Sequence, residues 1–160
     1  MTAKTASIDK TVPGFTLPAT GGRPWQLSAA AGKNLVIYFY PRDNTSGCTR
    51  ESVAFRDLYL QFKKAKTAIV GISTDSLASH AKFKAKFELP FELLADEKRL
   101  ACTLFDVYKE KSMYGKKYLG VERSTFLIDA KGVLRQEWRK VKVDGHAEEV
   151  LAAARSLSPL

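Results

Sequence analysis

The sequence predicts an α/β fold with a mixed central sheet and helices on both faces. Two observations lead to this class. Strand-like and helical segments alternate along the chain, and the first two helices each connect near-continuous apolar runs, which are typical of strands buried on both faces. The 160 residues contain no linker, repeat or low-complexity segment. We therefore expect a single domain over residues 1–160, long enough for one substantial core.

The first half of the chain begins with apolar–polar alternation around Gly21 and Gly22, which predicts an N-terminal β-hairpin over residues 13–28. The apolar run "NLVIYFY" indicates a buried strand, and the spacing that follows it is helical. The expected elements after the hairpin are a strand at 34–40, a helix at 49–64, a strand at 67–74, and a helix at 76–87 capped by Asp75 or Ser76.

The second half continues the alternation of strands and helices. Its expected elements are a strand at 91–96, a short helix around 97–105, two strands within 123–141 joined through the turn 129–132, and an amphipathic helix at 145–157 that opens at Asp144 or Gly145.

Composition excludes several classes of protein. The net charge is +9, but the basic residues are scattered over four stretches, "FKKAKT", "KFKAKF", "GKKYLG" and "WRKVKV". Because they form no basic tail, we expect solvated faces and no nucleic-acid partner. No apolar run approaches the roughly 20 residues of a membrane span. The N-terminus lacks the apolar block of a signal peptide, so we expect a cytoplasmic protein without a membrane partner.

The chain has two cysteines, Cys48 and Cys102, and two histidines, His80 and His146. Two cysteines do not make a disulfide framework, and without a CxxC pair they do not make a zinc site. No phosphate-binding glycine loop is present either. We therefore expect no metal and no cofactor. In a reducing cytosol, Cys48 is either an inert side chain or a reactive thiol.

Cys48 lies where a predicted strand passes into a predicted helix, in the stretch "YFYPRDNTSGCTRES". The free N–H groups and the dipole of a helix's first turn favour negative charge, and nearby cations favour a thiolate. Arg42 and Arg50 are the local candidates for such a cation. Thr45 can turn its hydroxyl toward the sulfur. The alternatives are that Thr45 is only a helix cap and that Pro41 only ends the strand.

The stretch "PRDNTSGC" fits the Pro-x-x-x-Thr-x-x-Cys motif and resembles the peroxiredoxins. The stretches "FYPRDNTSGCTRESVAFRDL", "MYGKKYLGVERSTFLID" and "KVKVDGHAEEVL" are similar to the bacterioferritin comigratory protein, or peroxiredoxin Q, branch. This similarity runs from about residue 12 to residue 151. It implies a thioredoxin-like fold with extra N-terminal strands, and an antioxidant enzyme that reduces hydrogen peroxide and organic hydroperoxides with thiols.

The resemblance also implies roles for individual residues. Cys48 matches the peroxidatic cysteine, whose thiolate attacks a peroxide oxygen and becomes a sulfenic acid. Thr45 and Arg123 match the residues that bind the peroxide, and Pro41 matches the proline that shields the sulfur from water. Glu51 is usual at its position in this branch, where it orients an arginine.

The sequence departs from the branch at the second, resolving cysteine. Many members carry it five residues after the first, where this chain has Val53, and others carry it near the stretch "HAKFKAKF", which has none. Cys102 is the only candidate left, but its apolar neighbours favour a packing role. We therefore expect a one-cysteine mechanism, in which thioredoxin, or glutathione with glutaredoxin, reduces the sulfenic acid directly.

Other functions stay open at this point. A peroxide sensor or redox-relay protein would use the same Cys48 but pass its oxidation to a partner as a mixed disulfide. Two-cysteine turnover through Cys102 is a second alternative. A disulfide reductase of the thioredoxin type is disfavoured, because that chemistry needs paired cysteines. Members of this branch are often monomers, so we expect a monomer.

Overall fold

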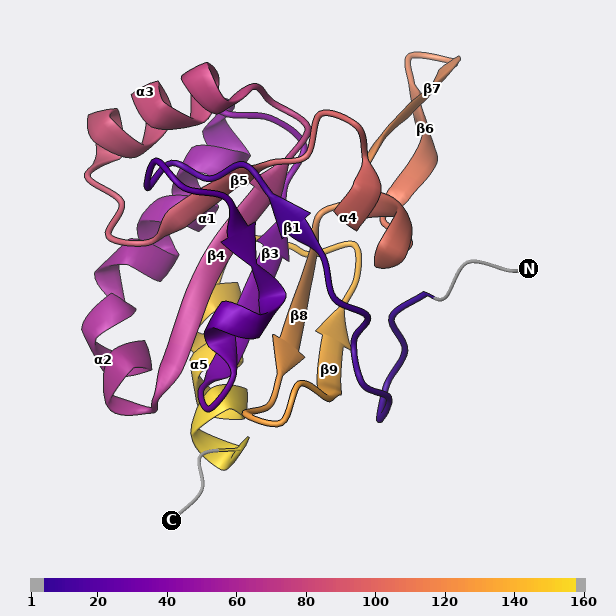
Figure 1. The fold of residues 1–160 in the computed structure, drawn as a ribbon. Helices are drawn as coiled ribbons and strands as arrows, with labels where there is room; N and C mark the ends of the chain where they lie inside the picture. Colours follow the sequence, from indigo (N-terminus) through magenta and orange to yellow (C-terminus); the bar gives the residue numbers. More distant parts are fainter. Residues whose placement is uncertain (1–4, 158–160) are drawn as a thin grey trace.

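A five-stranded sheet forms the centre of the computed structural model, which describes residues 5–157 (Figure 1). The strand order is β5-β4-β3-β8-β9. The strands are β3 (Asn34–Phe39), β4 (Thr67–Ser73), β5 (Glu92–Ala95), β8 (Ser124–Ile128) and β9 (Leu134–Trp138). β3, β4 and β5 run parallel, whereas β8 pairs antiparallel with β3 and β9 pairs antiparallel with β8. The predicted mixed sheet is therefore confirmed.

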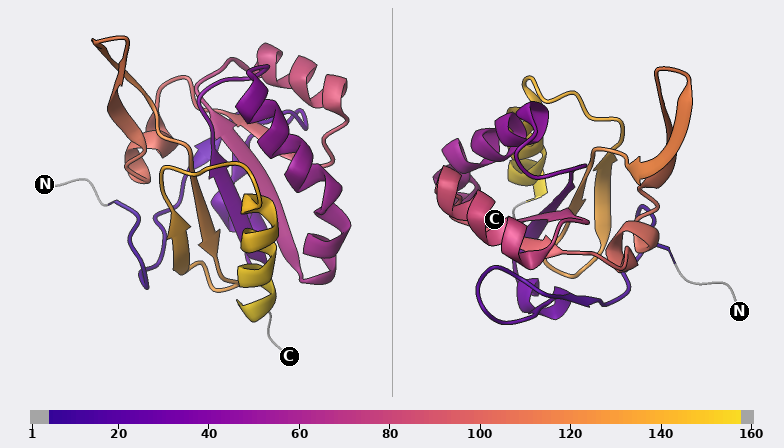
Figure 2. Two further views of the ribbon diagram at one scale, coloured as in Figure 1. Left: turned by 180° about the vertical axis from the view of Figure 1, so that it is seen from behind. Right: turned by 90° about the horizontal axis from the view of Figure 1, so that it is seen from above.

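The central strand β3 is buried on both faces, and its alternate side chains enter two separate apolar clusters. Most helices cover one face, and Figure 2 shows them together from behind; they are α1 (Ser46–Asp57), α2 (Tyr59–Lys64), α3 (Leu77–Phe87) and α5 (His146–Leu157). The other face is covered by the N-terminal segment, the 3-10 helix η1 (Leu27–Ala30) and the short helix α4 (Leu100–Leu104). Within residues 5–157, no helix has the length and apolarity to cross a membrane.

The predicted N-terminal hairpin is present, although its strands β1 (Thr16–Leu17) and β2 (Trp25–Gln26) are only two residues long. The loop between them packs along the edge strand β5, where Ala19 forms a bridge with Leu94. The N–H of Ala95 donates to the carbonyl of Pro18 at 2.9 Å. The hairpin thus covers backbone groups that an edge strand would otherwise expose.

The helix predicted over residues 49–64 is divided in the structure. It begins earlier, at Ser46, and stops at Asp57; after Leu58 the helix α2 continues to Lys64. Phe55 of α1 and Phe62 of α2 both remain fully buried in the same apolar cluster. Because the apolar spacing continues across the break, periodicity in the sequence did not reveal it.

An antiparallel hairpin that the sequence pattern did not predict is formed by β6 (Tyr108–Met113) and β7 (Lys116–Val121). This hairpin projects from the body of the molecule (Figures 1 and 2). Its turn contains Tyr114, which is 96% exposed, and most of β7 is exposed as well. The hairpin packs against the core only at its base, through Tyr108 and Val121. Its projecting part needs no apolar alternation, which removes the signal that predicts strands.

Gly71 on β4 leaves room for the side chains of Tyr38 on β3 and Leu93 on β5. A Cβ at this position would lie 2.7 Å from Cζ of Tyr38 and 2.9 Å from Cδ2 of Leu93. Tyr38 has no room to move, because its hydroxyl is hydrogen-bonded to Ser52 at 2.9 Å and its ring is fully buried. The position therefore requires glycine for steric reasons.

We expect Gly71→Ala to lower the free energy of unfolding by about 2 kcal/mol, because the added methyl group overpacks the core. Urea denaturation measures this change. Gly14→Ala is the matched control: a Cβ at Gly14 meets nothing within 4 Å, so its effect should stay within about 0.5 kcal/mol. Equal destabilisation by the two substitutions would show that the contact with Tyr38 is not the cause.

Candidate active site

The loop between β3 and α1 places Cys48 in the first turn of α1, as the sequence predicted. β3 ends at Phe39, and the chain then turns through Asn44, whose φ of 63° lies in the left-handed region. Thr45 occupies the position before the helix in extended conformation. The side chain of Cys48 is packed against the apolar cluster beneath the helices, and the residue is only 1% exposed.

Arg123 is the cation that reaches the sulfur. It lies in the two-residue connection between β7 and β8, directly before Ser124, the first residue of β8, which pairs with Phe39 at the end of β3. This register brings the guanidinium beside α1, where Nη2 donates to Sγ of Cys48 at 3.3 Å. A Cβ at Gly47 would lie 3.2 Å from the same Nη2, so the glycine leaves room for this approach. The arrangement stabilises negative charge on the sulfur.

Glu51, one helical turn after Cys48, holds the same guanidinium from the other side. Its Oε1 accepts from Nη1 of Arg123 at 2.6 Å. Burial raises the pKa of Glu51 to about 7, although the charge and hydrogen bond of Arg123 act in the opposite direction. Burial lowers the pKa of Arg123, but Glu51 and Cys48 outweigh it, and the net shift is upward. Arg123 therefore remains charged.

Two further features of the site were not predicted. Lys111 on β6 donates to the carbonyl of Val121 at 2.8 Å. Burial and the charge of Arg123 lower the pKa of Lys111, whereas Cys48 acts in the opposite direction. The amine of Lys111 therefore lies close enough to Arg123 and Cys48 to interact with both electrostatically. In addition, Oε2 of Glu51 is buried without a hydrogen-bond partner among the described residues. Lys111 was not predicted as a site residue because it lies on β6, a strand that the sequence pattern did not reveal.

Several expectations about neighbouring residues need correction. Arg50 does not turn toward Cys48, because it pairs with Asp144 at 2.7 Å on the surface. The hydroxyl of Thr45 donates to the carbonyl of Arg42 at 3.0 Å, and neither caps the helix nor contacts the sulfur in this state. Arg42 is exposed, and Pro41, directly after the buried Tyr40, is half-buried. The cation at the sulfur is therefore Arg123, which the resemblance implied, and not the local candidates Arg42 and Arg50.

Cys102 lies far from this arrangement in the fold. It is fully buried in the apolar cluster on the opposite face of the sheet, and its N–H donates to Oδ2 of Asp96 at 2.8 Å. Burial, followed by the charge of Asp96, raises the pKa of the Cys102 thiol well above its usual range. Both cysteines are free thiols in the structure. The central sheet separates them.

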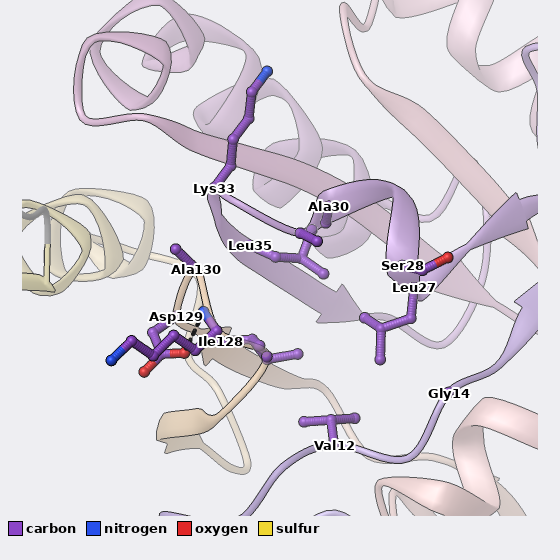
Figure 3. A pocket seen from close by; sticks show the side chains of 13 residues that line it. Val12, Gly14, Leu27, Ser28, Ala30, Lys33, Leu35, Ile128, Asp129 and Ala130 are labelled. Carbon is purple, nitrogen blue, oxygen red and sulfur yellow. Dashed lines mark hydrogen bonds between the residues drawn. The ribbon is translucent and has the colours of Figure 1, made fainter.

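An apolar cavity of about 270 Å³ lies at the other end of the sheet, where β3 begins and β8 ends (Figure 3). Asp129, the acidic residue at its rim, accepts from the N–H of Lys131 and from Arg135, so its carboxylate is already engaged. The cavity contains neither cysteine; its lining is Val12, Gly14, Leu27, Ser28, Ala30, Ala31, Lys33, Leu35, Ile128, Asp129, Ala130, Lys131 and Gly132. The reactive groups are gathered at the opposite end, around Cys48.

Comparison with known proteins finds a family match that includes Cys48, Glu51 and Arg123. Residues 8–137 match the AhpC/TSA family. The chain belongs to the AhpC/TSA family.

The similar proteins within this family are peroxiredoxins. The chain is 51% identical over 144 residues to peroxiredoxin Bcp of Xanthomonas campestris, covering 89% of this chain and 90% of that protein. It is 46% identical over 154 residues to peroxiredoxin Bcp of Bacillus subtilis, covering 96% and 98%. A solved structure of Xanthomonas campestris peroxiredoxin Q superimposes with a TM-score of 0.86 at 50% identity, covering 91% of this chain and 92% of that one.

These similarities confirm the thioredoxin-like fold and the branch expected from the motifs. This AhpC/TSA family member is a thiol peroxidase of the Bcp and peroxiredoxin Q branch.

His146 gives the region around Arg123 a pH-dependent stability. Its Nε2 is hydrogen-bonded to Thr125 at 2.8 Å, and burial followed by the charge of Arg123 lowers its pKa to about 4. An unfolded chain protonates this histidine near pH 6.5. Between these two values the unfolded state binds more protons, so acidification weakens the folded state. The raised pKa of Glu51 acts with the opposite sign.

We expect His146→Gln to isolate this contribution. Between pH 7 and pH 4 the free energy of unfolding of the wild type should fall by about 2 kcal/mol more than that of His146→Gln, after allowance for solvent screening. Urea denaturation at several pH values measures both proteins. Parallel curves for the two proteins would assign the pH dependence to other groups.

Proposed function

We propose that this peroxidase reduces hydrogen peroxide and organic hydroperoxides through Cys48, with Arg123 as the residue that activates the sulfur and binds the peroxide. The single observation that carries this proposal is the 3.3 Å contact between Nη2 of Arg123 and Sγ of Cys48. Glu51 fixes the same guanidinium at 2.6 Å, so the donor is oriented before any peroxide arrives. Preorganised charge of this kind lowers the barrier of a step in which negative charge develops.

The reaction follows from this geometry. The thiolate of Cys48 attacks the terminal oxygen of the peroxide, the S–O bond forms, and the O–O bond breaks. The electron pair of the broken bond leaves on the second oxygen, which takes a proton and departs as water or an alcohol. The sulfur is oxidised to a sulfenic acid and the peroxide is reduced. Arg123 stabilises the charge on both oxygens during the transfer.

Thr45 and Pro41 complete the proposed site. The hydroxyl of Thr45 donates to the carbonyl of Arg42 at 3.0 Å. A rotation of this side chain frees the hydroxyl to bond the peroxide, so Thr45 binds substrate together with Arg123. The ring of Pro41 shields the sulfur from water at the end of β3. Both roles rest on the motif and on the position of the loop beside Cys48.

Recycling by an external thiol fits the positions of the two cysteines. A disulfide needs α-carbons within about 7 Å and side chains that point toward each other. Cys48 and Cys102 instead pack into clusters on opposite faces of the sheet. The raised pKa of Cys102 also disfavours the thiolate that would have to attack the sulfenic acid. Thioredoxin, or glutathione with glutaredoxin, then reduces Cys48 directly.

A peroxide sensor is the second candidate function. With Val53 at the usual position of a resolving cysteine, the sulfenic acid of Cys48 persists until an outside thiol meets it. A long-lived sulfenic acid can form a mixed disulfide with a partner and pass on its oxidation. Rapid turnover with thioredoxin or glutathione distinguishes the enzyme from the sensor, which recycles slowly after fast oxidation.

We expect Arg123→Lys to lower kcat/KM for hydrogen peroxide by about 10² to 10³-fold, because lysine cannot hold Cys48 and Glu51 at once. Glu51→Gln should lower it by about 10-fold, since the guanidinium loses its charged anchor. Stopped-flow oxidation of Cys48 measures both. Arg135→Lys, on β9 and paired with Asp9 and Asp129, is the control and should retain wild-type activity. Wild-type rates in Arg123→Lys would exclude the proposed activation.

We expect the wild type and Cys102→Ser to behave alike with one equivalent of hydrogen peroxide. Intact mass and free-thiol counts should show one oxygen added and one thiol lost in each protein, with the sulfenic acid on Cys48 trapped by dimedone. Excess peroxide should then add a second oxygen, giving sulfinic acid. The loss of two thiols as an internal disulfide in the wild type alone would establish Cys102 as the resolving cysteine.

A further inference from the structure

A buried polar network lies under the loop that carries the motif around Cys48. At its centre is Asp43, midway between Pro41 and Thr45, and only 7% exposed. Its carboxylate accepts three hydrogen bonds: from the hydroxyl of Tyr40 at 2.6 Å, from the hydroxyl of Ser79 at 2.8 Å, and from Nδ1 of His80 at 2.8 Å. These contacts join the loop to the first turn of α3.

Both ring nitrogens of His80 face acceptors in this network. Nδ1 faces the Asp43 carboxylate, and Nε2 lies 2.9 Å from the main-chain carbonyl of Leu94, which can only accept. Burial raises the pKa of Asp43, but the hydrogen bonds from His80 and Tyr40 outweigh it and lower the pKa below its usual value. The Asp43 carboxylate and the His80 ring therefore form a buried hydrogen-bonded pair, with His80 fully buried.

The backbone of the loop is tied down at the same point. The N–H of Asp43 donates to Oδ2 of Asp75 at 2.8 Å, and Ser73 donates to the same oxygen at 2.6 Å. Asp43, Asp75 and His80 lie close enough to hold a metal ion. However, both carboxylate oxygens of Asp43 and both nitrogens of His80 already have protein partners. The chemistry of the network is that of a structural anchor.

We propose that the Asp43–His80 pair is a positioning device for the peroxidatic cysteine: it holds the loop closed, so that Cys48 stays buried beside Arg123. Immediately after Asp43 the chain reverses through Asn44, and two residues later α1 begins. A shift of the loop at Asp43 is therefore transmitted to the helix turn that contains Cys48. Sub-ångström control of reacting groups matters for this kind of chemistry. The proposal rests on the proposed function of Cys48.

The test uses Asp43→Asn, His80→Gln and the double variant of the full chain. We expect iodoacetamide to alkylate Cys48 about 10-fold faster in each, because the loop opens, and hydrogen peroxide to oxidise Cys48 about 10-fold slower, because the alignment with Arg123 is lost. The double variant should resemble the single variants, as expected for partners in one interaction. A change in the nucleophilicity of the thiol alone would move both rates in the same direction. Opposite changes therefore indicate a change in the exposure and alignment of Cys48.

Asp96→Asn is the matched control for general destabilisation. Asp96 is also buried, but it accepts N–H groups of α4 on the other face of the sheet. At equal thermal stability it should leave both rates unchanged. Ser79→Ala removes one hydrogen bond and should fold; we expect a shift of about 2- to 3-fold in the same two directions. If Asp43→Asn, His80→Gln and the double variant do not fold, the two rates of Ser79→Ala decide whether the proposal holds.

Unchanged alkylation in folded Asp43→Asn, His80→Gln or Ser79→Ala would overturn the proposal. So would a loss of wild-type peroxidase activity in EDTA that Mg²⁺, Mn²⁺ or Zn²⁺ restores, because the cluster would then hold an ion. Alkylation requires no peroxide, so the two proposals fail separately. If the wild type does not react with peroxide but the alkylation rates differ as expected, the proposed function fails and the anchor stands.

Discussion

The site depends on one guanidinium that bridges two groups of the same helix. Arg123 contacts Cys48 and Glu51, which lie one turn apart on α1. The antiparallel register of β8 on β3 sets its position, because Phe39 pairs with Ser124, and Arg123 therefore stands at the end of β3, where the chain leaves for α1. Since side chains alternate along a strand, a slip of one residue would turn Arg123 to the other face and leave the sulfur without its donor.

Burial gives this bridge its strength. Cys48 is 1% exposed and Glu51 is 1% exposed, so the charge of Arg123 acts on both groups through protein more than through water. Burial of Glu51 raises its pKa to about 7, and burial of Lys111 lowers the pKa of that amine. A group of opposite charges in one small volume is costly to assemble unless each charge faces a partner. The guanidinium meets this condition because its geometry serves two partners at once.

Two separate sets of contacts hold the loop before α1 and the cysteine that follows it. Asp43 and His80 secure the loop to α3, and Arg123 secures the first turn of α1 to β8. The two sets of contacts are on different elements but share a short segment of chain. In the proposed mechanism, burial of the sulfur protects the thiolate from solvent and also limits the access of a reducing thiol, so the proposed loop closure would affect both halves of the catalytic cycle.

The sequence by itself determined the alternation of strands and helices and the position of Cys48 at a strand-to-helix junction. These features are local, and propensity and spacing encode them. Its resemblance to the peroxiredoxins indicated Thr45, Pro41 and Arg123. Only the tertiary structure decided that Arg123, not Arg42 or Arg50, reaches the sulfur. It also decided that the sheet separates Cys102 from Cys48, and that Asp43 pairs with His80. Each is a contact between distant segments, set by strand register and packing, which no local pattern records.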